Sequence, residues 1–221
     1  MTNYLLQTID LKKSYENKNG IIDLFSKVNV KIKRGELVAL IGPSGSGKSS
    51  FLHLLALLDD PNKGKILFND KDTKHLDDEE KDEIRRKKIS IIFQENNLLT
   101  DFTAIENVIM PLIIRGENKA SSITKATKIF RKVKIHNRIN HFPNELSGGE
   151  QQRVAIARAL ITESELILAD EPTGNLDSNA ADKLHKLFFK LRDSFGYTFL
   201  IVTHNKDFAE MADRKISIVD G

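Results

Sequence analysis

The sequence predicts an α/β fold with a mainly parallel sheet and an inserted helical lobe. Three observations lead to this prediction. Short runs of β-branched and apolar residues recur along the chain, as expected for strands that are covered on both faces. Most of these runs are separated by stretches with helical periodicity, and this alternation favours parallel strands joined by crossover helices. From Leu98 to about Thr162 the pattern is helical throughout.

The candidate strands lie before and after this helical stretch. They are Leu37–Ile41, Lys65–Asn69, a run starting at Ile89, Leu166–Asp170, Thr198–His204 and Lys215–Val219. We therefore expect residues 1–97 and 163–221 to form the α/β lobe, and residues 98–162 to form the helical lobe.

Two segments of the helical lobe fit the capping-box pattern of a helix start. They are Thr103–Glu106 and Ser147–Glu150, and in each a hydroxyl and a glutamate satisfy otherwise exposed backbone amides. The run Asp77–Lys88 is acidic first and basic last, an order that suits the helix dipole. We interpret this run as a solvated helix face.

Composition excludes several classes of protein. The chain has 221 residues, a net charge of +3 and 40% hydrophobic residues, as is ordinary for a globular domain. It has no cysteine, which excludes disulfides and thiolate metal sites. The near balance of 34 basic and 31 acidic residues gives no reason to expect nucleic acid as a partner. We expect no signal peptide, and the apolar runs are shorter than the ~20 residues that a spanning helix needs.

A glycine-rich loop follows the first of these candidate strands. Gly42–Ser49 reads GPSGSGKS, which matches the phosphate-loop pattern G-x-x-x-x-G-K-[ST] between a predicted strand and a predicted helix. Glycines let backbone amides point at phosphate oxygens, Lys48 supplies a charge, and Ser49 offers a hydroxyl to Mg²⁺. The alternative is a glycine-rich helix cap, which the full match disfavours. The predicted phosphate-binding residues are Gly42, Pro43, Ser44, Gly45, Ser46, Gly47, Lys48, Ser49 and Ser50.

Polar side chains follow three other predicted strands. Asp170 and Glu171 end an apolar strand, His204 ends the next one, and Gln94 follows the run at Ile89. Ligands of open parallel sheets bind at the carboxyl ends of the strands. Asp170 suits a Mg²⁺ shell, and Glu171 is a candidate base for a water that attacks a phosphate. Gln94 either contacts Mg²⁺ or the water or caps its strand, and His204 either reaches the phosphate or is an ordinary surface histidine.

Two further features carry weaker signals. A helix cap explains Ser147 and Glu150, but it does not explain the glycines between them, Gly148 and Gly149. Glycine weakens a helix start unless the backbone must approach another group closely. Tyr15 is either an ordinary strand aromatic or a platform on which a base stacks.

Together these segments resemble the nucleotide-binding subunit of ATP-binding cassette (ABC) transporters. The resemblance covers nearly the whole chain: the phosphate loop, Gln94, the signature LSGGE, the strand LILADE, the loop GNLD ending at Asp177, and His204. It implies an antiparallel β portion near the N-terminus, ATP and Mg²⁺ as ligands, and a head-to-tail homodimer. In such a dimer the signature of one copy meets the phosphate held by Lys48 of the other. Nucleotide would then contact Tyr15, Gln94, Ser147, Gly148, Gly149 and Asp177, with Ser49, Gln94 and Asp170 around the metal.

Within this family the segment Leu98–Ile114 and the sequences around the signature are most similar to ATPases of lipoprotein-releasing systems. Ser50 and Gln151 depart from the threonine and arginine often found there. The resemblance implies peripheral attachment to the cytoplasmic face of a bacterial inner membrane, through permease subunits of the LolC/LolE kind. Leu98, Leu99 and Phe102 would line the groove for the permease, unless they only pack the helical lobe. Alternatives are a MacB-like exporter, an FtsE-like division ATPase, a soluble ABC ATPase acting on ribosomes or DNA, and a phosphate-loop kinase.

Overall fold

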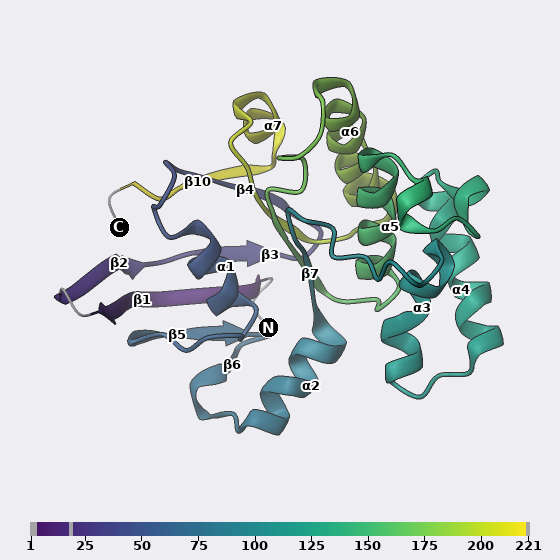
Figure 1. The fold of residues 1–221 in the computed structure, drawn as a ribbon. Helices are drawn as coiled ribbons and strands as arrows, with labels where there is room; N and C mark the ends of the chain where they lie inside the picture. The colour runs from purple at the N-terminus through teal and green to yellow at the C-terminus, as the bar shows by residue number, and fades with distance from the viewer. Residues whose placement is uncertain (1–3, 18–19, 220–221) are drawn as a thin grey trace.

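The computed structural model describes residues 4–17 and 20–219, which form two sheets and the helices around them (Figure 1). One sheet is antiparallel and has the order β2-β1-β5-β6, with β3 also paired to β1. Its strands are β1 (Tyr4–Asn17), β2 (Gly20–Val28), β3 (Lys31–Lys33), β5 (Lys63–Phe68) and β6 (Lys71–Asp72). This sheet is the N-terminal antiparallel portion that the resemblance implies.

The second sheet is parallel throughout and has the order β10-β4-β9-β8-β7. Its strands are β4 (Leu37–Ile41), β7 (Ile89–Ile92), β8 (Leu166–Asp170), β9 (Phe199–Val202) and β10 (Arg214–Ser217). The predicted α/β class with a parallel core is therefore confirmed. Small differences occur at strand ends: β5 stops before Asn69, whose φ of 50° does not fit a strand, and β9 stops two residues before His204.

The helices lie on both sides of the parallel sheet. They are α1 (Lys48–Leu55), α2 (Asp78–Lys88), α3 (Ala104–Ile114), α4 (Lys119–Lys132), α5 (Gly148–Leu160), α6 (Ser178–Phe195) and α7 (Lys206–Met211), with short 3₁₀ turns at Thr73–His75, His136–Arg138 and Pro143–Glu145. Both predicted helix starts, at Thr103 and Ser147, precede a helix, and the charged run forms α2, which buries no residue. Within the described ranges, no helix has the length and apolar character to cross a membrane.

Two hydrophobic clusters fill the two faces of the parallel sheet. Along β8, Leu166 and Leu168 belong to the cluster with α1 and the antiparallel sheet, whereas Ile167 and Ala169 belong to the cluster with α3–α6. This alternation follows from the two-residue period of a strand. It places α1 and α5 on opposite faces of the sheet, as Figure 1 shows.

Candidate functional site

The phosphate loop joins β4 to α1 in a backbone conformation that requires glycine. Gly45 and Gly47 have φ angles of 80° and 86°, in the left-handed region that side chains disfavour. A Cβ on Gly47 would also lie 3.2 Å from the ring of Phe25, and one on Gly42 would lie 2.4 Å from the carbonyl oxygen of Ile218. The loop thus packs closely against Phe25 and Ile218 and forms a cradle of backbone groups that only glycine allows at these positions.

Two side chains of the loop, Lys48 and Ser46, have polar groups that a bound anion would satisfy better than the protein does. The Nζ of Lys48 donates hydrogen bonds to the carbonyls of Gly42 (3.0 Å) and Pro43 (2.8 Å), and the residue is only 6% exposed. The hydroxyl of Ser46 is buried without a hydrogen-bond partner among the described residues. A buried hydroxyl without a partner is costly, and an ammonium bonds more strongly to an anion than to a carbonyl. Both features fit a bound phosphate.

Four neighbouring strands of the parallel sheet carry the predicted residues at their carboxyl ends. β4 leads into the phosphate loop, β9 leads to His204, β8 ends at Asp170 and β7 is followed by Gln94. Because the strands are parallel, these ends lie along one edge of the sheet. The sheet therefore brings together residues that lie up to about 160 positions apart in the sequence. It places them at the edge where open parallel sheets bind their ligands.

Glu171 and His204 are in direct contact. Their side chains approach to 2.7 Å between Oε1 and Nε2. Glu171 also has a φ of 43°, which is unusual for a residue with a side chain. Its backbone N–H is bonded to the carbonyl of Val202, so the strained residue is tied to the strand that leads to His204. A carboxylate held in this way can take a proton from water while the imidazole orients it.

Gln94 extends toward the loop that follows Glu171. Its Nε2 donates to Oδ1 of Asn175 at 3.3 Å, and a Cβ on Gly174 would lie 2.9 Å from the same Nε2. Within the described part of the chain, no three His, Asp or Glu side chains form a metal site by themselves. Ser49 and Asp170 would hold Mg²⁺ only together with phosphate oxygens, which is how proteins usually bind this ion.

The signature segment caps α5. The carboxylate of Glu150 accepts hydrogen bonds from the backbone N–H and the hydroxyl of Ser147, both at 2.9 Å, and from Arg138 at 2.9 Å. The hydrogen bond from Arg138 and those from Ser147 lower the pKa of Glu150 below its ordinary value. Gly148 and Gly149 lie within the first turn of the helix, and neither has a positive φ.

The signature glycines also border a cavity of about 400 Å³. It is lined by Ser147, Gly148, Gly149, Glu150, Arg153, Asn175, Leu176, Asp177, Asn179, Ala180 and Lys183. Asp177 also caps α6, because its side chain accepts from the backbone N–H of Ala180 at 2.9 Å. No phosphate-loop residue lines this cavity, and the two loops begin helices on opposite faces of the sheet. One chain therefore does not bring the phosphate loop and the signature together.

Tyr15 lies on β1 with 43% of its surface exposed. Its hydroxyl donates to Asp59 at 2.9 Å, and the ammonium of Lys13 lies 4.8 Å from the ring centre. Burial of Asp59 works against ionisation, but hydrogen bonds from Lys13 and Tyr15 outweigh it and lower the pKa of Asp59. The ring is thus held in place and partly open, as a stacking platform requires.

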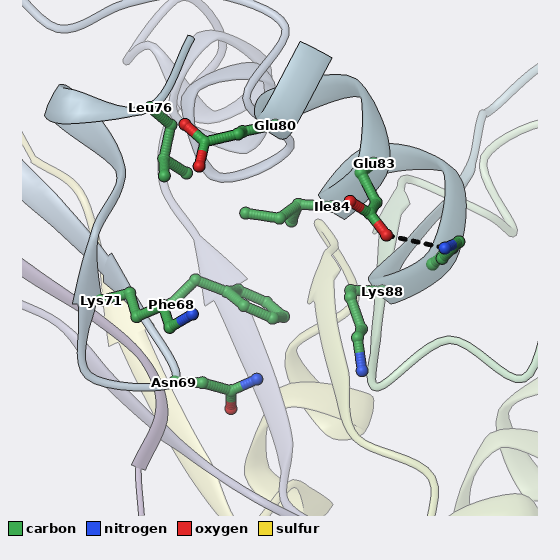
Figure 2. Close-up of a pocket in the computed structure, with 9 residues that line it drawn as sticks. Phe68, Asn69, Lys71, Leu76, Glu80, Glu83, Ile84 and Lys88 are labelled. Carbon is green, nitrogen blue, oxygen red and sulfur yellow. Dashed lines mark hydrogen bonds and ion pairs between the residues drawn. The ribbon is translucent and has the colours of Figure 1, made fainter. Parts of the chain in front are cut away.

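A further cavity, of about 360 Å³, lies between β5 and α2 (Figure 2). Phe68 and Ile84 form part of its wall, and Glu83 and Lys87 pair at its rim. It contains none of the residues that the sequence predicts to bind nucleotide. The candidate site therefore remains at the carboxyl edge of the parallel sheet.

Several residues near the site escaped the sequence-based prediction. The ring of Phe25 packs beside Gly47, and Asn175 accepts a hydrogen bond from Gln94. Arg138 donates a hydrogen bond to Glu150 in the signature cap. None stands at a diagnostic spacing from its partner in the sequence, so only the fold reveals these contacts. The one available signal was Asn175, which lies inside the GNLD segment already singled out.

Comparison with known proteins agrees with this geometry. Residues 25–174 match the family model described as ABC transporter. A lipoprotein-releasing system ATP-binding protein LolD of Cytophaga hutchinsonii is 42% identical over 217 residues, covering 98% of this chain and 97% of the relative. The LolD of Colwellia psychrerythraea is 43% identical, covering 98% of this chain and 84% of its own length.

Solved structures show the same fold. A dimeric structure of MJ0796, a bacterial ABC transporter cassette, is 40% identical and superposes with a TM-score of 0.88 over 98% of this chain and 95% of that one. A post-hydrolysis dimer of the same cassette, bound to ADP and Pi, gives a TM-score of 0.86 at 40% identity, over 96% of this chain and 94% of that one. The chain belongs to the ABC transporter family, as an ATP-binding cassette with the fold of an ATPase.

Proposed function

We propose that this protein is the ATP-hydrolysing subunit of a complex that releases lipoproteins from the bacterial inner membrane. The observation that carries the ATPase assignment is the contact between Glu171 and His204, at the sheet edge where β4 leads into the phosphate loop. The lipoprotein assignment rests on the LolD relatives, which match almost the whole chain. MacB-like export and FtsE-like division remain the second candidates, because they share the ADEPTGNLD sequence.

In the proposed mechanism, two copies pack head to tail with ATP between them. The cradle from Gly42 to Ser50 holds the phosphates, and Lys48 leaves its two carbonyl partners to bond with them. Tyr15 stacks on the base, while Ser147, Gly148 and Gly149 of the second copy face the terminal phosphate. The dimeric MJ0796 cassettes and the location of the two loops on opposite faces of the sheet support this arrangement.

Water activation falls to the contacting pair. Glu171 accepts the proton of the attacking water, and His204 holds Glu171 and the terminal phosphate in register. Ser49, Asp170 and Gln94 would hold Mg²⁺, which would neutralise charge on the phosphates. Asp177, at the start of α6, lies beside the signature and contributes to the same interface.

Glu171→Gln tests this function. The amide cannot take a proton, so ATP turnover should stop while ATP binding persists, and a stable dimer should form in Mg-ATP. Size-exclusion chromatography with and without Mg-ATP measures the dimer, and Glu79→Gln on the exposed face of α2 is the matched control. A Glu171→Gln protein that remains monomeric in saturating Mg-ATP would contradict the head-to-tail dimer.

The membrane partner is proposed to dock beside Leu98, Leu99 and Phe102. Leu99 and Phe102 are 44% and 39% exposed, whereas Leu98 packs partly against the core. The loop that carries the exposed pair is fixed by the buried side chain of Asn107. Its Oδ1 accepts from the N–H of Leu99 at 2.8 Å, and its Nδ2 donates to the carbonyl of Phe102 at 2.9 Å. The apolar side chains of Leu99 and Phe102 are thus exposed on a loop whose backbone is fixed by hydrogen bonds to Asn107.

Leu99→Asp tests the docking site. The exposed position predicts a folded subunit that binds ATP but no longer co-purifies with LolC/LolE-like permease subunits and no longer attaches to the inner membrane. Ile114→Asp, at a 75% exposed position of the same lobe, is the matched control. A marked fall in the melting temperature of Leu99→Asp would show instead that the side chain supports the core.

A further inference from the structure

Gln151 makes three hydrogen bonds that join two loops of the site. Its Nε2 donates to the carbonyls of Pro143 (2.7 Å) and Leu146 (3.2 Å), in the segment that leads into the signature. Its Oε1 accepts from the Nδ2 of Asn96 at 2.8 Å. Asn96 lies two residues after Gln94, so one partly buried amide spans the signature loop and the segment after Gln94.

Other residues of α5 hold the same segment. Arg158 donates to the carbonyls of Asn96 and Asn97, both at 2.8 Å, and Gln152 donates to the carbonyl of Phe93 at 3.3 Å. These contacts attach the segment to the body of the helix. Gln151 differs from them because its amide also binds the carbonyls of Pro143 and Leu146 before the signature. Of these three side chains, it alone connects the two loops.

The bridge borders a cavity that the two loops share. This cavity of about 450 Å³ is lined by Gln94, Glu95, Asn96, Asn97, Leu98, Gly148, Gln151, Gln152, Pro172, Asn175 and Leu176. Gln94 on one wall would sense the nucleotide of this chain, and Gly148 on the other would face the nucleotide of the second copy. A side chain between these walls is in position to couple them.

We propose that Gln151 is a positioning residue that holds the signature of one ATP site in register with the Gln94 segment of the other. This inference rests on the proposed dimer. When nucleotide displaces Gln94, the bridge carries the displacement to Pro143 and Leu146, and hence to Ser147 at the start of α5. Without the bridge the two loops move independently. Closure of the dimer must then order each loop separately.

Gln151→Met tests the proposal because it keeps the length of the side chain but removes all three hydrogen bonds. In the Glu171→Gln background, we expect about tenfold more ATP for half-maximal dimer formation, because closure must then order two loops that the bridge no longer joins. In the otherwise unchanged protein, the ATP concentration for half-maximal turnover should rise by a similar factor. ATP affinity at protein concentrations too low for dimers should not change.

Two further variants separate coupling from general destabilisation. Gln7→Met removes a buried amide on β1 that donates to Asp70 in the turn between β5 and β6, so it should leave the ATP requirement for dimers unchanged. Gln151→Arg keeps donors for Pro143 and Leu146 but cannot accept from Asn96, so it should show the defect in part. Asn96→Ala combined with Gln151→Met should add little to Gln151→Met alone, because both remove the same bond.

The outcomes are distinguishable. If Glu171→Gln alone never dimerises, the proposed dimer fails and this inference falls with it. If Glu171→Gln dimerises and Gln151→Met leaves its ATP requirement unchanged, only the role of Gln151 is overturned. Equal defects in Gln7→Met and Gln151→Met would also overturn it, because the effect would then be general.

Discussion

The phosphate loop and the signature are both glycine-rich segments that begin a helix, yet they differ in how fully their polar groups are hydrogen-bonded. Among the residues that the structure describes, the phosphate loop has two left-handed glycines, a buried Ser46 hydroxyl without a hydrogen-bond partner, and a lysine bonded only to carbonyls of its own loop. The signature has ordinary helical glycines, and its cap is closed by Ser147, Glu150 and Arg138.

In the proposed dimer, this difference would let the two segments bind the phosphates in different ways. The phosphate loop gains partners that it lacks when phosphate arrives, so it can bind nucleotide within one chain. The cap of the signature is already hydrogen-bonded. Its glycines serve mainly because, without side chains, they leave the backbone at the start of α5 accessible. In the proposed dimer the signature would therefore contribute binding energy only when a second chain brings a phosphate already held elsewhere.

Lys48→Ala is the largest test of this contrast. Removal of the ammonium should lower ATP turnover by at least ~10²–10³-fold and weaken nucleotide binding, because a positioned charge on the phosphates is lost. The fold should survive, since in the described part of the chain the Lys48 ammonium bonds only to carbonyls of its own loop. Turnover and bound fluorescent nucleotide are the measurements, with Lys125→Ala, on the exposed face of α4, as the control. Near-normal turnover would refute the phosphate-loop assignment.

The sequence was sufficient for features that depend on local pattern. The parallel strands, the two helix starts in the helical segment and the phosphate loop follow from period, capping residues and glycine spacing. That the glycine pair in the signature serves more than a helix cap stays a prediction, because its backbone is ordinary for a helix start. A Cβ on Gly148 would lie 3.4 Å from Leu176, so packing within the chain tolerates one.

Features that depend on distant contacts were beyond the sequence. Tyr15 bonds to a residue 44 positions away, and Gln151 bonds to one 55 positions away. The left-handed backbone of Glu171 is another example, because no local pattern predicts a strained carboxylate at the end of a strand. The division into an α/β lobe and a helical lobe stays a prediction, since α3–α5 share one hydrophobic cluster with the sheet.

Alanine substitutions at the two kinds of glycine sharpen the comparison. Gly47→Ala forces a side chain into a left-handed backbone, with its Cβ 3.2 Å from Phe25, so it should cost ~1–2 kcal/mol of stability and weaken ATP binding. Gly148→Ala should leave stability within ~0.5 kcal/mol, yet weaken ATP-dependent dimers of the Glu171→Gln protein. Thermal unfolding and chromatography measure the two effects. A destabilised Gly148→Ala with normal dimers would reverse the assigned roles.

The smallest effect concerns the closed cap of the signature. Hydrogen bonds from Arg138 and Ser147 lower the pKa of Glu150 from its ordinary 4.5, so its ionised form is favoured in the folded state. A depressed pKa contributes stability that is complete above the unfolded value and is lost as pH falls through the folded value. Glu150→Gln should therefore be less stable than the natural protein at pH 7, by at most ~1 kcal/mol because the cap is partly exposed. The difference should shrink below about pH 4 as the carboxyl takes up its proton. Melting temperatures from pH 7 to pH 3 give the measurement, and Arg138→Gln should reproduce the trend. A deficit that is equally large at pH 3 would mean that Glu150 acts through packing, and the signature would then lack the charged cap that distinguishes it from the phosphate loop.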